Sequence, residues 1–322
     1  MTDIADQLTK YLTDAHSIEQ QALAQMRSAP DIAGDPQLSA MYREHLGETE
    51  EHERLVRELL EARGASASRI KDAVMAAGGK GFVLFAASQP DTPGKLHAHA
   101  LSYEALELGA YELLRRVAEA AGDEQIASTA RRIAGEERQM MERLEATFDL
   151  AADAALREVG ADDKGQLVKY LADAHAIEQQ ATALLKRGSK IAGSDTLAEI
   201  YAHHLEETQD HSRAVEARLE ALGASPSTVK DAAMRLGALN WGAFFQAQPD
   251  TPGKLACFAH AFEYLEIGGY EQLKRVASRA GDDDSARLVE HILAEERRAA
   301  ERIARAFDAA VAASLEVQGV AA

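Results

Sequence analysis

Cysteine is nearly absent from this chain. Cys257 is the single cysteine among 322 residues, so no disulfide can form within one chain and a zinc site built from several thiolates is excluded. This cysteine usage is typical of a reducing compartment. The N-terminus, from Met1 to Asp6, is polar and acidic, which is unlike a signal peptide. We therefore expect a cytoplasmic protein.

Basic residues are also scarce relative to acidic ones. The chain has 35 Lys and Arg against 53 Asp and Glu, a formal net charge of −18. Nucleic-acid phosphates and anionic membrane surfaces are bound by basic patches, which this balance disfavours. No apolar stretch approaches the roughly 20 residues that a membrane-spanning helix needs. We expect neither a nucleic acid nor a membrane as a partner.

Glycine, proline and aromatic residues are few, and no segment shows the alternation of a β-strand. Alanine, leucine and glutamate, which favour helices, are abundant. The sequence predicts an all-α fold in which four long helices form a bundle, with a short extra helix in the crossover between the second and third. In the first half, the expected helices lie at approximately 3–28, 36–63, 66–87, 93–121 and 123–156.

The second half of the chain repeats the first. Residues 165–319 match residues 6–160 at a constant offset, as Tyr170 and Tyr11 show (170 − 11 = 159). A chain that contains the same unit twice allows each residue to be compared with its copy. We predict two tandem domains of similar fold, residues 1–160 and 161–322.

Polar residues recur on the apolar seam of the long helices in both copies. Inward positions of a bundle helix alternate at spacings of three and four residues. In the first copy this rule selects Glu19, His45, Glu48, His52, Glu107 and Glu137, with Glu104 at the edge of the same face. In the second copy it selects Glu178, His204, Glu207, His211, Glu266 and Glu296, with Glu263 at the edge.

Carboxylates that converge in a core without partners repel one another and cost several kcal/mol. A cluster of divalent cations removes this cost, and imidazole together with carboxylate suits iron or manganese. Taken singly, such a residue more often lies at the edge of a bundle, solvated or in an ion pair. Their recurrence on four helices favours two divalent metal ions per domain, with iron ahead of manganese.

Four short motifs carry a family resemblance. They are His16-x-x-Glu19-x-Gln21, His45-x-x-Glu48-Thr49, Glu104-x-x-Glu107-x-x-x-Tyr111 and Ala134-Gly135-Glu136-Glu137, and each has a counterpart in the second copy. With these motifs the chain resembles the ferritin-like superfamily, and within it the YciF-like (DUF892) family. The resemblance implies a dinuclear metal centre inside each bundle and a pairing of bundles. The duplication can supply that pair within one chain, and further oligomerisation stays open.

The chain departs from the wider ferritin-like pattern on its last helix. Met140 and Ala299 stand where a second Glu-x-x-His motif would place histidine. Our hypothesis is that His45 and His52 flank Glu48 on one helix and replace the missing ligand. One of the two histidines could instead hydrogen-bond a ligand rather than bind a metal.

Two classes of function compete at this point. In the first, the centres are di-iron sites that react with O2 or peroxide, as a ferroxidase or peroxidase in stress protection. In the second, the protein is a non-enzymatic, stress-related binding or assembly module whose metal is structural or absent. The second depends on the apolar glycine- and phenylalanine-rich segments at 78–85 and 237–245, which could form a partner surface.

Overall fold

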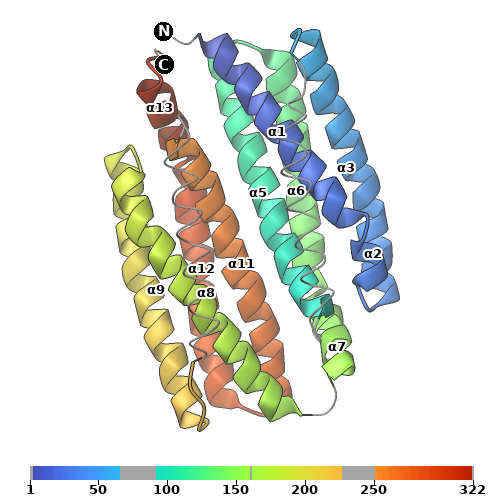
Figure 1. The fold of residues 1–322 in the computed structure, drawn as a ribbon, viewed down its shortest axis with the longest axis vertical. Coiled ribbons are helices and arrows are strands. Elements are labelled where there is room, and N and C mark those ends of the chain that lie inside the picture. The colour runs from blue at the N-terminus through green and yellow to red at the C-terminus, as the bar shows by residue number, and fades with distance from the viewer. Residues whose placement is uncertain (1–2, 66–91, 160–161, 227–250, 321–322) are drawn as a thin grey trace. The chain divides into compact units, whose positions relative to one another are not determined.

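The structure is a computed structural model of the chain, and it describes residues 3–65, 92–159, 162–226 and 251–320 (Figure 1). The chain divides into two compact units, Met1–Gly160 and Ala161–Ala322. Within the described ranges every regular element is an α-helix. The predicted all-α fold of two tandem helical bundles is therefore confirmed. None of the described helices combines the length and apolar character that crossing a bilayer requires.

Four long helices form the first unit. They are α1 (Ile4–Met26), α3 (Pro36–Ala62), α5 (Thr92–Ala120) and α6 (Glu124–Ala146), and two short helices, α2 (Ala29–Ile32) and α7 (Phe148–Val159), accompany them. Helix α1 packs against α3 and α5, and α6 packs against the same two helices. The four long helices therefore surround a single core (Figure 1).

The direction of these helices follows from contacts at one end of the bundle. Arg63, just after α3, donates to the carbonyl oxygen of Ala5 at 3.2 Å and to Oδ2 of Asp123 at 3.0 Å. The end of α3 therefore lies beside the beginnings of α1 and α6. Since α5 ends where α6 begins, α3 and α5 run in the same direction. Two helices that run in the same direction are what the predicted crossover bundle has at these positions.

The second unit repeats this arrangement. Its helices are α8 (Asp163–Ile191), α9 (Asp195–Ala221), α11 (Thr251–Arg279), α12 (Asp283–Arg305) and α13 (Phe307–Val317). Helix α8 contacts α9 and α11, and α12 contacts the same two. The main difference is that α8 continues through the region where the first unit has the break between α1 and α2.

Short side chains fix where the long helices begin. Asp123 and Asp282 each accept a hydrogen bond from a backbone N–H of the first turn, at 3.1 and 2.9 Å, and so satisfy a donor that has no partner inside the helix. Gly193, before α9, has φ of +70°, and an added Cβ would lie 2.5 Å from Cγ of Pro252. Only glycine allows both this backbone conformation and this close approach.

The structure corrects the last predicted helix. We expected one helix over 123–156, but it is interrupted at Thr147, and the second unit has the same break at Ala306. The interruption turns the buried rings of Phe148 and Phe307 inward. Phe148 packs against His97, with 4.7 Å between ring centroids. No glycine or proline stands at either break, so the interruption goes with this packing rather than with a local breaker residue.

The short extra helix that we expected at 66–87, in the crossover, lies outside the described residues. The apolar segments at 78–85 and 237–245, on which the assembly hypothesis depends, lie outside them as well.

Candidate metal centre

Four helices of the first unit bring six acidic and imidazole side chains into its core. A four-residue cluster consists of His45 from α3, Glu104 and Glu107 from α5, and Glu137 from α6. One potential ligand atom of each residue lies within 4.8 Å of those of the others. Nε2 of His45 is 3.0 Å from Oε2 of Glu104 and 4.0 Å from Oε2 of Glu137.

A three-residue cluster lies beside it and shares one member. It consists of Glu19 from α1, His52 from α3 and again Glu137. Nδ1 of His52 is 2.9 Å from Oε1 of Glu137 and 4.0 Å from Oε1 of Glu19. Glu137 therefore turns one oxygen toward each histidine. A carboxylate in this position can bridge two cations.

The second unit repeats both clusters with matching residues. Its four-residue cluster consists of His204, Glu263, Glu266 and Glu296, and its three-residue cluster of Glu178, His211 and Glu296. Oε2 of Glu296 is 3.5 Å from Nε2 of His204, and its Oε1 is 2.8 Å from Nδ1 of His211. The shared carboxylate thus occupies the same bridging position in both units.

These side chains are closed off from solvent. No member of the clusters is more than 2% exposed. Within the described part of the chain, both carboxylate oxygens of Glu107 and of Glu266 lack a hydrogen-bond partner, as does Oε2 of Glu19 and of Glu178. A buried polar atom without a partner is costly, and cations between the clusters would remove that cost. The residues therefore fit metal ions, and the buried groups could hold them.

His45 is held from its outer side by a carboxylate and an arginine. Its Nδ1 lies 2.9 Å from Oε2 of Glu48, and the same oxygen accepts a 2.6 Å hydrogen bond from Arg143 of α6. The hydrogen bond with His45 lowers the pKa of Glu48 to about 2, and Arg143 contributes in the same direction. An ionised Glu48 keeps a proton on Nδ1, so Nε2 is the nitrogen that faces the cluster and could bind a metal ion.

His52 has an outer partner that the sequence analysis did not assign. Its Nε2 lies 2.7 Å from Oε2 of Glu136, and in the second unit Nε2 of His211 lies 2.8 Å from Oε2 of Glu295. The consecutive pair Glu136-Glu137 was visible in the motif. Neighbouring residues of a helix point about 100° apart. One can therefore enter the cluster while the other reaches the histidine from outside.

A tyrosine donates to the carboxylate of α1 in each unit. The hydroxyl of Tyr111 hydrogen-bonds Oε1 of Glu19, and that of Tyr270 donates to Oε1 of Glu178 at 2.5 Å. All four side chains are buried. The hydrogen bond orients the carboxylate, so that its other oxygen faces away from the tyrosine.

Burial shifts the titration of several cluster carboxylates toward their protonated forms. It raises the pKa of Glu19 and of Glu178 to about 8, and that of Glu107 and Glu266 well above the usual range. Burial acts in the opposite sense on His52, but the hydrogen bond and charge of Glu137 prevail and raise its pKa to about 9. Metal ions would have to displace these protons, so metal affinity is coupled to pH.

The structure brings together most of the predicted site residues. Glu19, His45, His52, Glu107 and Glu137 meet in the core, and so do Glu178, His204, His211, Glu266 and Glu296. Glu104 and Glu263, expected at the edge of the inward face, belong to the four-residue clusters. Glu48 and Glu207 lie outside the clusters, with 32% and 16% of the side chain exposed, and contact the outer nitrogen of a histidine.

The last helix supplies no histidine to either centre. Met140 and Ala299, which stand at the position of the missing ligand, are buried in the core. Both histidines of α3 instead face the clusters, one in each, as the flanking hypothesis requires. The geometry differs from that hypothesis in one respect, because the residue between the two imidazoles is Glu137 rather than Glu48.

The comparisons with known proteins give one family. The model of the family described as "Domain of unknown function (DUF892)" matches residues 3–157 and again residues 164–316. No solved structure matches the chain. The two matches cover nearly the whole sequence and correspond to the two copies of the repeat. The chain therefore belongs to the DUF892 family, as a tandem duplication of its domain.

Proposed function

We propose that each unit is a ferritin-like domain, residues 1–160 and 161–322, that holds two metal ions in its core. The observation that carries this proposal is the position of Glu137, which turns one carboxylate oxygen toward His45 and the other toward His52. Glu296 has the same position in the second unit. A carboxylate shared between two imidazole-containing clusters is the arrangement that two neighbouring cations need.

Charge supports the number of ions. Each unit buries the four carboxylates and two histidines of its two clusters. With neutral imidazoles, four ionised carboxylates carry a charge of −4, which about two divalent cations would balance. Mixed nitrogen and oxygen donors suit iron and manganese. We propose iron as the metal and manganese as its closest substitute.

We further propose that the reaction is an oxidation of Fe(II) by O2 or peroxide, which would remove oxidant under stress. Iron would supply the electron transfer. The chain's own residues have separate tasks. Glu48 and Glu136 accept hydrogen bonds from the outer nitrogens of His45 and His52. The other nitrogen of each ring then faces the cluster. The surrounding apolar side chains exclude bulk water from the centre. Cys257, which is buried and forms no disulfide, agrees with placement in a reducing cytoplasm.

The iron content of the protein tests the proposal. The full chain is loaded with Fe(II) under anaerobic conditions and desalted, and its iron is measured per chain. We expect about four ions, two for each bundle. Exchanging both bridging residues, Glu137→Gln with Glu296→Gln, should remove most of this iron. Admission of O2 or peroxide to the loaded protein should then oxidise the retained Fe(II).

A matched control is available on the same helices. Glu142 and Glu301 are equivalent exposed residues of α6 and α12, so Glu142→Gln with Glu301→Gln changes the charge equally without touching the clusters. This control should retain the iron of the unaltered protein. If the unaltered protein retained none, or the bridging variant retained all of it, the core carboxylates and imidazoles would be a structural polar network. The assembly hypothesis would then take precedence.

A further inference from the structure

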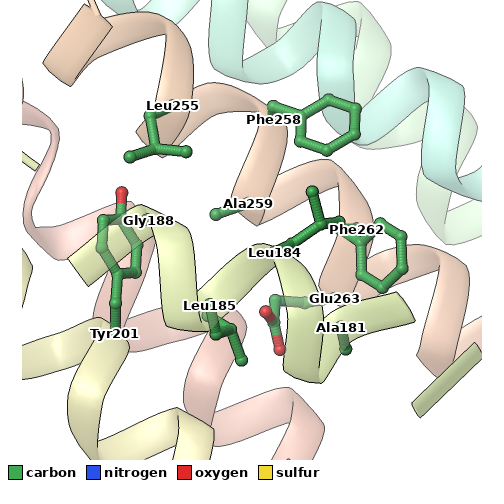
Figure 2. Close-up of a pocket in the computed structure, with 10 residues that line it drawn as sticks. All are labelled: Ala181, Leu184, Leu185, Gly188, Tyr201, Leu255, Phe258, Ala259, Phe262 and Glu263. Atoms are coloured by element: carbon green, nitrogen blue, oxygen red, sulfur yellow. The ribbon is translucent and has the colours of Figure 1, made fainter. Parts of the chain in front are cut away.

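An apolar pocket lies next to the four-residue cluster of the second unit (Figure 2). Its volume is about 30 Å³. Side chains of α8 and α11 form most of the wall, among them Leu184, Leu185, Phe258 and Phe262. The carboxylate of Glu263 lies among them, and its Oε2 is 2.7 Å from Nε2 of His204. The pocket therefore ends on a residue of the candidate metal centre.

The size and chemistry of the pocket restrict what it can hold. A single water needs roughly 10–15 Å³ by this measure, whereas sites for organic ligands have roughly 300 Å³ or more. A molecule of two heavy atoms therefore fits, and an organic substrate does not. The hydroxyl of Tyr201, on the pocket wall, has no hydrogen-bond partner in the described part of the chain. An ordered water needs two to four polar partners, and among the lining side chains only Tyr201 and Glu263 offer polar atoms, the others being aliphatic or aromatic.

The first unit differs at the same positions. Gln25 and His99 take the places of Leu184 and Phe258, by the offset of 159, and Nε2 of His99 lies 3.1 Å from Oε1 of Gln25. Ala29 takes the place of Gly188. A polar side-chain bridge and an additional methyl group thus stand where the second unit has an apolar entrance.

We propose that the pocket of the second unit is a binding site for dioxygen, and that it makes the two metal centres unequal. Dioxygen is apolar and has two heavy atoms, so it matches the walls and the volume. It would reach the second centre beside Glu263, whereas the Gln25–His99 bridge closes the corresponding route in the first unit. The prediction that a small apolar molecule binds here depends only on the pocket. Only the inequality of the two centres rests on the proposed function.

Xenon tests the binding site without any metal. It is a small apolar probe of such cavities. Crystals of the metal-free full chain under xenon pressure should show a xenon atom between α8 and α11, beside Leu185. Gly188→Ala should lower its occupancy, because the new Cβ would lie 3.7 Å from Leu255 and from Tyr201, in ordinary contact, and would take up part of the space.

Gly269→Ala is the matched control for this variant. It also converts a helical glycine of the second unit into the alanine of the first, Ala110, and the nearest atom to its Cβ is Ile177 Cδ1 at 3.7 Å. Gly269 does not line the pocket, so its variant should keep the xenon. A pocket filled by ordered water or hydrogen peroxide in place of xenon would overturn the assignment.

The inequality of the centres is measured on the iron-loaded chain. Mixing with O2 should oxidise one half of the Fe(II) in a fast phase and the other half in a slow phase. The pair Leu184→Gln with Phe258→His transplants the bridge of the first unit and should slow the fast phase severalfold with the iron content retained. Xenon binding without iron retention would refute the proposed function alone. A single oxidation phase with no xenon site would refute this inference alone.

Discussion

The hydroxyl of Tyr270 donates a 2.5 Å hydrogen bond to Oε1 of Glu178, the carboxylate that α8 contributes to the second centre. Tyr111 and Glu19 form the same pair in the first unit. Both partners are buried, and the same oxygen of Glu178 lies 3.6 Å from Nδ1 of His211, so the hydrogen bond positions the glutamate beside the cluster.

Removing this donor should weaken metal binding without unfolding the bundle. We expect Tyr111→Phe with Tyr270→Phe to lower Fe(II) affinity by about 10–100-fold, the usual effect of losing a group that orients a ligand. Competition titration with a coloured chelator measures the affinity. Tyr42→Phe is the control, since the Tyr42 hydroxyl hydrogen-bonds His97 outside the clusters. Equal affinities in all three proteins would show that Glu19 and Glu178 do not bind the metal.

The role of Glu48 can be separated from that of Glu137. Glu48 contacts the outer nitrogen of His45, whereas Glu137 lies between the two histidines. We expect Glu48→Ala with Glu207→Ala to retain both ions of each centre with affinity lower by about 10–100-fold. Glu137→Gln with Glu296→Gln should instead lower the number of iron ions that each chain binds. Iron content at saturating Fe(II) distinguishes the two effects. Complete loss of iron in this variant would show that Glu48 binds the metal directly.

Helix geometry explains why Glu48 lies outside the two clusters. His45 and His52 are seven residues apart and return to the same face of α3. Glu48 lies three residues after His45, which rotates it by about 300°, or about 60° off that face. It therefore reaches sideways to Arg143 of α6. Residue spacing alone gives the inward face of α3. It does not tell which side chains near that face turn aside to contact a neighbouring helix.

Glu104 shows the opposite case. It lies three residues before Glu107, so the same rotation placed it at the edge of the inward face. Helix α5, however, packs against both α1 and α6, and its buried face is wider than one seam. Glu104 is fully buried as a result. Widths of buried faces, and the break at Thr147, depend on neighbouring helices and could not be obtained from periodicity.

The stability of the metal-free protein should fall as pH rises from about 5 to 9. Burial raises the pKa of Glu19 and Glu178 to about 8, above the unfolded value of about 4.3. Carboxylates such as Glu137 raise the pKa of His52 to about 9 against the burial that would lower it. A group whose pKa is higher in the folded than in the unfolded protein binds more protons in the folded state. It therefore stabilises the fold fully at low pH, and this contribution is lost as the pH rises through the pKa of the folded state.

Denaturant unfolding after chelator treatment, at pH 5, 7 and 9, measures this trend. The lowered pKa of Glu48, about 2, acts in the opposite sense but only below about pH 4.5, outside the window. Loading with metal should reverse the trend, since deprotonated ligands bind cations more tightly. A stability that rises from pH 5 to 9 without metal would contradict the assigned protonation of the clusters.

Replacing a buried carboxylate by its neutral amide should separate stability from metal binding. Glu107 and Glu266 have the strongest case, because burial raises their pKa values and neither oxygen has a partner among the described residues. At pH 9 and without metal, Glu107→Gln with Glu266→Gln should stabilise each unit, because the buried amide carries no charge at any pH. With saturating Fe(II) the order should reverse, because the unaltered protein gains binding free energy that the variant loses. Paired unfolding curves with and without metal measure both effects. A variant less stable than the unaltered protein under both conditions would show that Glu107 and Glu266 serve the fold rather than a cation.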